Sequence, residues 1–270
     1  MHTSENGKIQ TSAMTIAGSD SGGNAGIQAD IRAFHVYGLH ACTVIAALTA
    51  QNPYGVRSVV IPDQKFIADQ MDSVFEEYTI SALKTGMLAN SSVIEVVAGK
   101  LAEQVGVLKV VDPVMVATSG AKLLADNAIE DMIGKMLPVA TLITPNLPET
   151  SVIVEKEVSS KSQMESAAKE IYDKHGCAVL VKGGHNLKSM AEDVLYDGKE
   201  LTWYSLPSIQ NPLSTHGTGC SLSAAITALL ARGNDLKTSV EKGKQYVWES
   251  IRSSIFVGKR ATVLGTPGIS

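Results

Sequence analysis

The pentapeptide His216-Gly217-Thr218-Gly219-Cys220 stands at the head of a stretch whose apolar residues recur at the three-and-four spacing of one helix face. These apolar residues are Leu222, Ala225, Ile226, Leu229 and Leu230. The first amides of a helix lack internal partners and lie at the positive end of its dipole, so glycines there let an anion reach the backbone. The pentapeptide therefore predicts a phosphoryl-transfer site at the start of a helix. Taken alone, it fits a simple glycine-rich turn before a helix equally well.

Short apolar runs alternate with longer amphipathic ones along the rest of the chain, which is the pattern of an α/β fold. The predicted strands cover residues 13–17, 41–48, 80–84, 108–112, 141–144 and 178–182. Most of them are nearly continuous in apolar residues, as expected of strands covered on both faces. The predicted helices cover residues 25–37, 64–77, 93–104, 127–136, 161–174, 217–231 and 236–253.

Two segments depart from this alternation. Residues 56–61 have the pattern of a short additional strand, and residues 193–196 with 201–204 that of a hairpin turning at Asp197-Gly198. No internal repeat, low-complexity tract or linker interrupts the chain. We therefore expect a single domain over residues 12–270, preceded by a polar N-terminal extension over residues 1–11.

Composition and charge favour small-molecule partners. With 270 residues, of which 44% are apolar and 19% charged, the chain is long enough to bury a large core. A net charge of −4 and the lack of a basic run argue against nucleic-acid binding. The N-terminus is polar and no apolar run is long enough to span a bilayer, so we expect no membrane partner and a cytoplasmic location. The three cysteines are widely spaced and odd in number, which fits neither a disulfide framework nor a zinc site.

Glycines and polar residues gather where the predicted strands end, and ligands of parallel α/β sheets bind beyond these carboxyl ends. The loop over residues 18–26 does not match G-x-G-x-x-G, and G-x-x-x-x-G-K-[ST] does not occur, so neither a dinucleotide fingerprint nor a P-loop is supported. The segments found there instead are Ile16-Ala17-Gly18-Ser19-Asp20, Ala25-Gly26-Ile27-Gln28-Ala29-Asp30, Ala50-Gln51-Asn52, Lys84-Thr85-Gly86-Met87-Leu88, Asp112-Pro113-Val114-Met115, Thr144-Pro145-Asn146-Leu147-Pro148-Glu149 and Lys182-Gly183-Gly184-His185.

Together with the pentapeptide, and in this order, these segments resemble the bacterial hydroxymethylpyrimidine/phosphomethylpyrimidine kinases of thiamin synthesis, within the ribokinase-like superfamily. The resemblance covers nearly the whole chain. It implies a three-layer α/β sandwich with a mostly parallel central sheet and helices on both faces. It also implies phosphorylation of 4-amino-5-hydroxymethyl-2-methylpyrimidine and then of its monophosphate, with ATP as donor and Mg²⁺ as cofactor.

The same resemblance assigns residues to the two substrates. Around the pyrimidine it places Gly18, Ala25, Gln51, Met87 and Val114. The Gln51 amide offers a donor and an acceptor, which suits the ring nitrogen and exocyclic amine of an aminopyrimidine. An ordinary polar loop residue is the alternative for Gln51, and plain core packing is the alternative for Met87 and Val114.

On the nucleotide side, the resemblance gives Asn146 and Glu149 a role in positioning Mg²⁺ and phosphates, with Asp112 as a second candidate metal ligand. Lys182 is expected to meet the ATP phosphates as a point charge. The alternatives are a turn cap for Asp112 and a solvated lysine for Lys182. His185 and His216 lack the spacing of metal ligands, and we expect supporting roles for both.

Cys220 stands where most sugar kinases of the superfamily have an aspartate base, and the pyrimidine kinases have cysteine. Because a helix start lowers a thiol pKa, we expect Cys220 to act as general base near neutral pH. The amides of Gly217, Thr218 and Gly219 are expected to form an anion hole for the transferring phosphoryl group. A buried inert thiol is the alternative.

Other functions stay open at this point. A pyridoxal kinase is the nearest alternative, because pyridoxal presents a hydroxymethyl group on a similar flat ring. A sugar kinase fits less well with Cys220, and a non-catalytic ligand-binding protein fits less well with the retained polar residues. Because relatives are commonly dimers, we also expect a homodimer.

Overall fold

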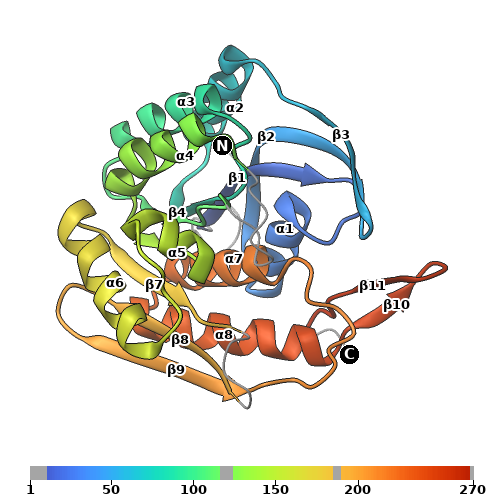
Figure 1. Ribbon diagram of the computed structural model, residues 1–270. Coiled ribbons are helices and arrows are strands. Elements are labelled where there is room, and N and C mark those ends of the chain that lie inside the picture. Colours follow the sequence, from blue (N-terminus) through green and yellow to red (C-terminus); the bar gives the residue numbers. More distant parts are fainter. Residues whose placement is uncertain (1–10, 116–123, 185–189, 268–270) are drawn as a thin grey trace, which may run out of the picture.

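The computed structural model of the protein describes residues 11–115, 124–184 and 190–267, so all but the last residue of the predicted N-terminal extension lies outside it (Figure 1). Within these residues a nine-stranded sheet has the order β3-β2-β1-β4-β5-β6-β7-β8-β9. Its strands are β1 Ser12–Asp20, β2 His40–Asn52, β3 Gly55–Val60, β4 Ile80–Thr85, β5 Leu108–Val111, β6 Leu142–Ile143, β7 Ala178–Lys182, β8 Met190–Tyr196 and β9 Leu201–Pro207. A separate hairpin joins β10 Ile255–Val257 and β11 Ala261–Val263.

The middle of the sheet is parallel and its two sides are antiparallel. Strands β2, β1, β4, β5, β6 and β7 pair in parallel, whereas β3 pairs antiparallel with β2, and β8 and β9 add an antiparallel hairpin beside β7. The carboxyl ends of the six parallel strands consequently share one edge of the sheet. This confirms the predicted mostly parallel sheet, the additional strand and the hairpin.

Helices cover both faces of the sheet. They are α1 Gly26–Val36, α2 Gln64–Glu77, α3 Ser91–Glu103, α4 Asp126–Asp131, α5 Leu147–Val154, α6 Lys161–His175, α7 Thr218–Ala231 and α8 Leu236–Arg252. Helices α2, α3, α4, α5 and α6 pack on one face of the sheet through one buried apolar cluster. Helices α1, α7 and α8 pack on the other face through a second cluster. Successive residues of a strand point to opposite faces of the sheet and so belong to different clusters. In β7, Val179 and Val181 belong to the first cluster, whereas Ala178 and Leu180 belong to the second. The fold is the predicted three-layer sandwich.

Helix α7 is the most deeply placed helix of its layer. Every residue from Ser221 to Ala231 is buried, because α7 packs on β4 and β5 and between α1 and α8. The contact with α8 is close: a Cβ added to Gly243 would lie 2.8 Å from Cγ1 of Ile226. This packing on three sides fixes the start of α7 at the carboxyl edge of the sheet.

Three local features differ from the sequence-based expectations. The helix predicted over residues 127–136 consists of the short helix α4, which continues as a π-helix, Met132–Met136, and then as a 3₁₀ turn, Leu137–Val139. In this last turn Pro138 has no N–H for a regular helical bond. Helix α5 was not predicted, because its short run of Thr, Ser and β-branched residues has low helix propensity. The β10–β11 hairpin was also missed, since its strands have three residues each.

Candidate active site

A cavity of about 800 Å³ opens at the carboxyl edge of the parallel strands, and every predicted site residue lines it. These residues are Gly18, Ala25, Gln51, Met87, Asp112, Val114, Asn146, Glu149, Lys182, Gly217, Thr218, Gly219 and Cys220. Segments spread over two hundred positions of the sequence therefore meet in one hollow. Of the two histidines singled out, His216 lines the cavity and His185 lies outside the described residues.

One part of the cavity is shaped by Gly18, Met87 and Gln51. A Cβ added to Gly18 would lie 2.6 Å from Cε of Met87, so the glycine makes room for the methionine side chain. The Gln51 Oε1 accepts a hydrogen bond from the Thr49 hydroxyl at 3.1 Å, and its Nε2 lies 3.5 Å from Nε2 of His216. The Ser21 hydroxyl donates to the Gln51 carbonyl at 2.9 Å and accepts from the Gln51 backbone amide at 2.8 Å. The backbone of Gln51 is thereby fixed where its side chain lines the cavity.

Val114 has a backbone that valine rarely adopts. Its φ is 42°, in the left-handed region that is costly for a β-branched residue. Val114 follows Asp112-Pro113 at the end of β5 and lines the cavity. Strain of this kind collects at functional sites, so the conformation favours a role in ligand contact over plain core packing.

The start of α7 lies directly against the backbone of the loop between β1 and α1. Gly217 has a φ of 88°, and a Cβ there would lie 2.0 Å from the Asn24 carbonyl oxygen. Gly26 has a φ of 57°, and a Cβ there would lie 2.2 Å from the Gly18 carbonyl oxygen. Any side chain at either position would push these segments apart. The glycines thus serve close backbone approach as well as turn geometry.

The predicted anion hole is partly occupied by a turn. The Thr218 amide donates a long bond of 3.4 Å to the Thr215 carbonyl, and the Thr218 hydroxyl donates to the same carbonyl at 3.0 Å. The Gly219 amide belongs to the first turn of α7, where intrahelical acceptors are lacking. Gly219 is consequently better placed than Thr218 to bind an anion.

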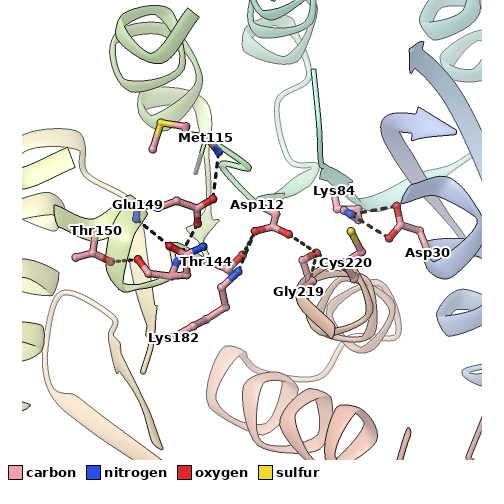
Figure 2. A network of polar contacts seen from close by, with 12 residues as sticks. Asp30, Lys84, Asp112, Met115, Thr144, Glu149, Thr150, Lys182, Gly219 and Cys220 are labelled. Carbon is pink, nitrogen blue, oxygen red and sulfur yellow. Dashed lines mark hydrogen bonds and ion pairs between the residues drawn. The ribbon is translucent and has the colours of Figure 1, made fainter. Parts of the chain in front are cut away.

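Asp112 and Lys182 form an ion pair beside the start of α7 (Figure 2). Lys182 Nζ lies 3.0 Å from Asp112 Oδ1, which also accepts a bond from the Thr144 hydroxyl at 3.3 Å. A Cβ on Gly219 would lie 3.6 Å from that Nζ and 3.7 Å from Asp112 Oδ2. Burial lowers the pKa of Lys182, but the nearby carboxylates outweigh it and hold the pKa above its ordinary value. The side chain therefore stays charged.

Glu149 is held on the far side of this pair by backbone amides. Its Oε1 accepts from the Met115 amide at 3.1 Å and its Oε2 from the Asn146 amide at 2.9 Å, while the Asn146 side chain caps α5 by accepting from the Glu149 amide at 2.8 Å. This is a capping box. Burial, together with the charge of Asp112, raises the pKa of Glu149 to about 6 against the lowering effect of Lys182.

The pKa of the Cys220 thiol is raised, whereas the sequence predicted that it would be lowered. Burial raises its pKa, and the charge of Lys84 lowers it only in part. The predicted lowering of this pKa by the helix start is wrong, because the cost of removing the thiolate charge from water outweighs the lowering effects of the helix start and Lys84. Cys220 as a whole is nonetheless half-buried at the cavity wall. The Gly26 amide also faces the sulfur. Burial raises the pKa of the Cys42 and Cys177 thiols as well, in keeping with core positions.

Three charged residues of this region were not given a role from the sequence. Asp20 accepts hydrogen bonds from the amides of Gly22, Asn24 and Ala25 at 2.8–3.0 Å and so shapes the loop beside α7. Asp30 and Lys84 form a buried ion pair behind Cys220 (Figure 2). A lysine inside a mostly buried strand requires a partner, and this requirement was the sequence signal available for Lys84.

The raised pKa of Glu149 predicts a pH-dependent stability. The folded protein holds this proton more tightly than the unfolded chain, so the free energy of unfolding should fall as the pH rises from 4.5 to about 6. In Glu149→Gln this contribution is absent. We expect the wild-type protein to lose about 2 kcal/mol relative to the variant over this range, as measured by urea unfolding. Parallel curves for the two proteins would contradict the assignment.

The sequence model of the phosphomethylpyrimidine kinase family matches residues 20–264. A hydroxymethylpyrimidine/phosphomethylpyrimidine kinase of Haemophilus influenzae is 39% identical over 91% of this chain and 93% of its own. A thiamine biosynthesis bifunctional protein of Geobacter sulfurreducens is 39% identical over 92% of this chain, which spans half the length of that relative.

Solved structures with the same fold include kinases of both predicted types. A Bacillus subtilis pyridoxal kinase in complex with ADP has a TM-score of 0.88 and 33% identity, over 96% of this chain and 98% of its own. A Clostridium difficile phosphomethylpyrimidine kinase has a TM-score of 0.80 and 38% identity, over 90% of this chain and all of its own. No helix among the described residues is long and apolar enough to cross a membrane. On the extent of these matches, the chain belongs to the phosphomethylpyrimidine kinase family.

Proposed function

We propose that the protein transfers the γ-phosphoryl group of ATP to 4-amino-5-hydroxymethyl-2-methylpyrimidine, and then a second one to the resulting monophosphate. The observation that carries this proposal is the order of groups in the cavity. Gln51 and Met87 line the proposed pyrimidine side, Asp112, Lys182 and Glu149 line the proposed phosphate side, and Cys220 belongs to the same lining. The family membership supplies the substrate class.

In the first reaction Cys220 first loses its own proton to water; the hydroxymethyl oxygen then attacks the γ-phosphorus of ATP while its proton passes to the Cys220 thiolate. A new O–P bond forms, and the bond between the γ-phosphorus and the bridging oxygen breaks to release ADP. The Gly219 amide and the Lys182 ammonium stabilise the charge of the transferring group. In the second reaction the attacking phosphate oxygen already carries charge near neutral pH, so a base contributes little.

The carboxylates fit a magnesium ion held largely by phosphates and water. Mg²⁺ usually takes one or two carboxylates together with substrate phosphates, and no group of three or more His, Cys, Asp or Glu ligands occurs among the described residues. Asp112 is the better direct ligand, since both Glu149 oxygens already accept amide bonds. Glu149 would contact the ion through water. When bound, Mg²⁺ neutralises the β- and γ-phosphate charge.

Pyridoxal phosphorylation is a second candidate activity. The observation that favours it is the similarity to the Bacillus subtilis pyridoxal kinase, at 33% identity over 96% of this chain. Pyridoxal also carries a hydroxymethyl group on a flat ring. A cavity of about 800 Å³ is large enough to admit either ring. We propose it as a related activity of the same site.

A homodimer through strand β3 is part of the proposal. Strand β3 forms one edge of the sheet, and all six of its residues are exposed. Its apolar side chains Val56, Val59 and Val60 are 53%, 48% and 64% exposed. An uncovered apolar edge strand is a site for pairing with another chain.

We treat residues 12–270 as one kinase domain, and the use of ATP and a reduced thiol fits a cytoplasmic enzyme.

The base role of Cys220 predicts different losses in the two reactions. In Cys220→Ala the phosphorylation of the alcohol should fall on the order of 10²–10⁴-fold, the usual contribution of a general base, while phosphorylation of the monophosphate falls much less. Rates are measured on each substrate at saturating ATP. Cys177→Ala removes a buried thiol elsewhere and serves as the matched control. Equal losses in both reactions would contradict the base role.

The pairing of Gln51 with the aminopyrimidine edge predicts a selective loss of affinity. Gln51→Leu should weaken pyrimidine binding by roughly 1–3 kcal/mol, because buried polar groups of the ligand lose their partner. ATP binding should be unchanged. Calorimetry with each ligand makes the comparison, and Gln64→Leu provides the same change at an exposed position of α2. Full pyrimidine affinity in Gln51→Leu would remove this residue from the site.

A charge on the exposed face of β3 should separate the dimer. We expect sedimentation velocity to give a dimer for the wild-type protein and a monomer for Val60→Asp, since the buried carboxylate would lack a partner. Val105→Asp is the matched control, because Val105 is 92% exposed in the turn after α3. A wild-type monomer would rule out the proposed homodimer.

A further inference from the structure

Asp30 and Lys84 form a fully buried ion pair that the reaction described above leaves without a role. Lys84 Nζ lies 3.0 Å from both carboxylate oxygens of Asp30, and both side chains have 0% exposure. The Thr15 hydroxyl donates to Asp30 Oδ2 at 2.6 Å. The pair ties helix α1 to strand β4 and, through Thr15, to β1.

A buried ion pair is a weak means of stabilising a fold. The cost of removing two charges from water is often larger than their attraction, and apolar residues of similar volume frequently do as well. Among the described residues, the Lys84 ammonium donates two hydrogen bonds, both to Asp30, although an ammonium has three N–H donors. The position of the pair therefore needs a reason other than stability.

That position is directly behind the thiol. Figure 2 shows the Cys220 sulfur turned toward the Lys84–Asp30 pair, and Lys84 is the largest charge acting on it. Gly86, in the same segment as Lys84, lines the cavity, and a Cβ there would lie 3.2 Å from the Lys84 ammonium. Glycine at this position lets the buried charge lie close beneath the cavity wall.

Several other groups act on the same sulfur. Asp30 and Asp112 raise the pKa of the Cys220 thiol, the Gly26 amide lowers it, and the sulfur also interacts with Lys182. Lys84 has a larger effect than either carboxylate. The pair is thus neutral as a whole, but its positive end has the larger effect on the sulfur and opposes the effect of burial.

We propose that Lys84, held in place by Asp30, is a positioning residue that stabilises the thiolate of Cys220 when it forms, by facing it with a buried ammonium. The inference rests on the proposed base role of Cys220. The free thiol loses its proton to water, and the thiolate is stabilised by the charge and the remaining N–H of Lys84. During the first reaction the thiolate takes the proton of the hydroxymethyl group, and it returns that proton to water after product release.

The test uses Asp30→Asn combined with Lys84→Met, because Lys84→Met alone would leave the Asp30 carboxylate buried without a partner. The rate at which iodoacetamide alkylates Cys220 is followed from pH 7 to pH 11.5 by mass spectrometry of the Cys220 peptide. We expect the midpoint of this profile to rise by about one pH unit in the double variant. The rate with the alcohol substrate at pH 7 should then fall about tenfold, and its pH profile should move upward by the same amount.

The matched control removes another buried pair. Lys244 Nζ lies 2.5 Å from Asp193 Oδ2, and Lys244→Met with Asp193→Asn should leave the alkylation midpoint of Cys220 where it is in the wild-type protein. Circular dichroism and urea unfolding show that each variant is folded.

An unchanged midpoint in the folded Asp30→Asn/Lys84→Met protein overturns the inference whatever its kinase activity, and so does an equal shift in the control. Failure of the underlying function is seen separately. If Cys220→Ala keeps full rates with the alcohol, Cys220 is not the base, independently of the alkylation profile.

Discussion

The site depends on close contact between two backbones at the carboxyl edge of the sheet. Gly217, at the start of α7, lies so near the Asn24 carbonyl that no side chain fits between them, and Gly26 approaches the Gly18 carbonyl in the same way. These contacts bring the first turn of α7 against the loop after β1. Because α7 is buried along the rest of its length, its start has no freedom to move away. The position of Cys220 follows from this packing.

Two ion pairs flank that helix start on opposite sides. Asp112–Lys182 lies toward the proposed phosphate side, and Asp30–Lys84 lies behind the thiol (Figure 2). Both lysines keep a raised pKa despite burial, because carboxylates lie within hydrogen-bond distance. The site therefore has two fixed positive charges. One suits an anionic phosphoryl group and the other suits a thiolate, as the proposed phosphoryl transfer to an alcohol would use.

Sequence patterns predicted the fold and the members of the cavity better than they predicted the state of each side chain. The strand-end segments all line one cavity, because parallel strands bring their carboxyl ends to a common edge. Helix α5 was missed although its capping box, Asn146 and Glu149, was singled out for its chemistry. The pKa of Cys220 was predicted in the wrong direction, since burial depth depends on the helices packed around α7 and not on the pentapeptide.

The sequence alone determined the alternation of strands and helices, the mostly parallel sheet and the residues that end each strand, because these follow from local periodicity and chain order. Only the tertiary structure decided which charges neutralise each other. Asp30 and Lys84 are separated by 54 positions, and Asp112 and Lys182 by 70. Their pairing depends on where α1, β4, β5 and β7 meet in space. The electrostatic state of Cys220, and with it the chemistry of the site, is set by that packing.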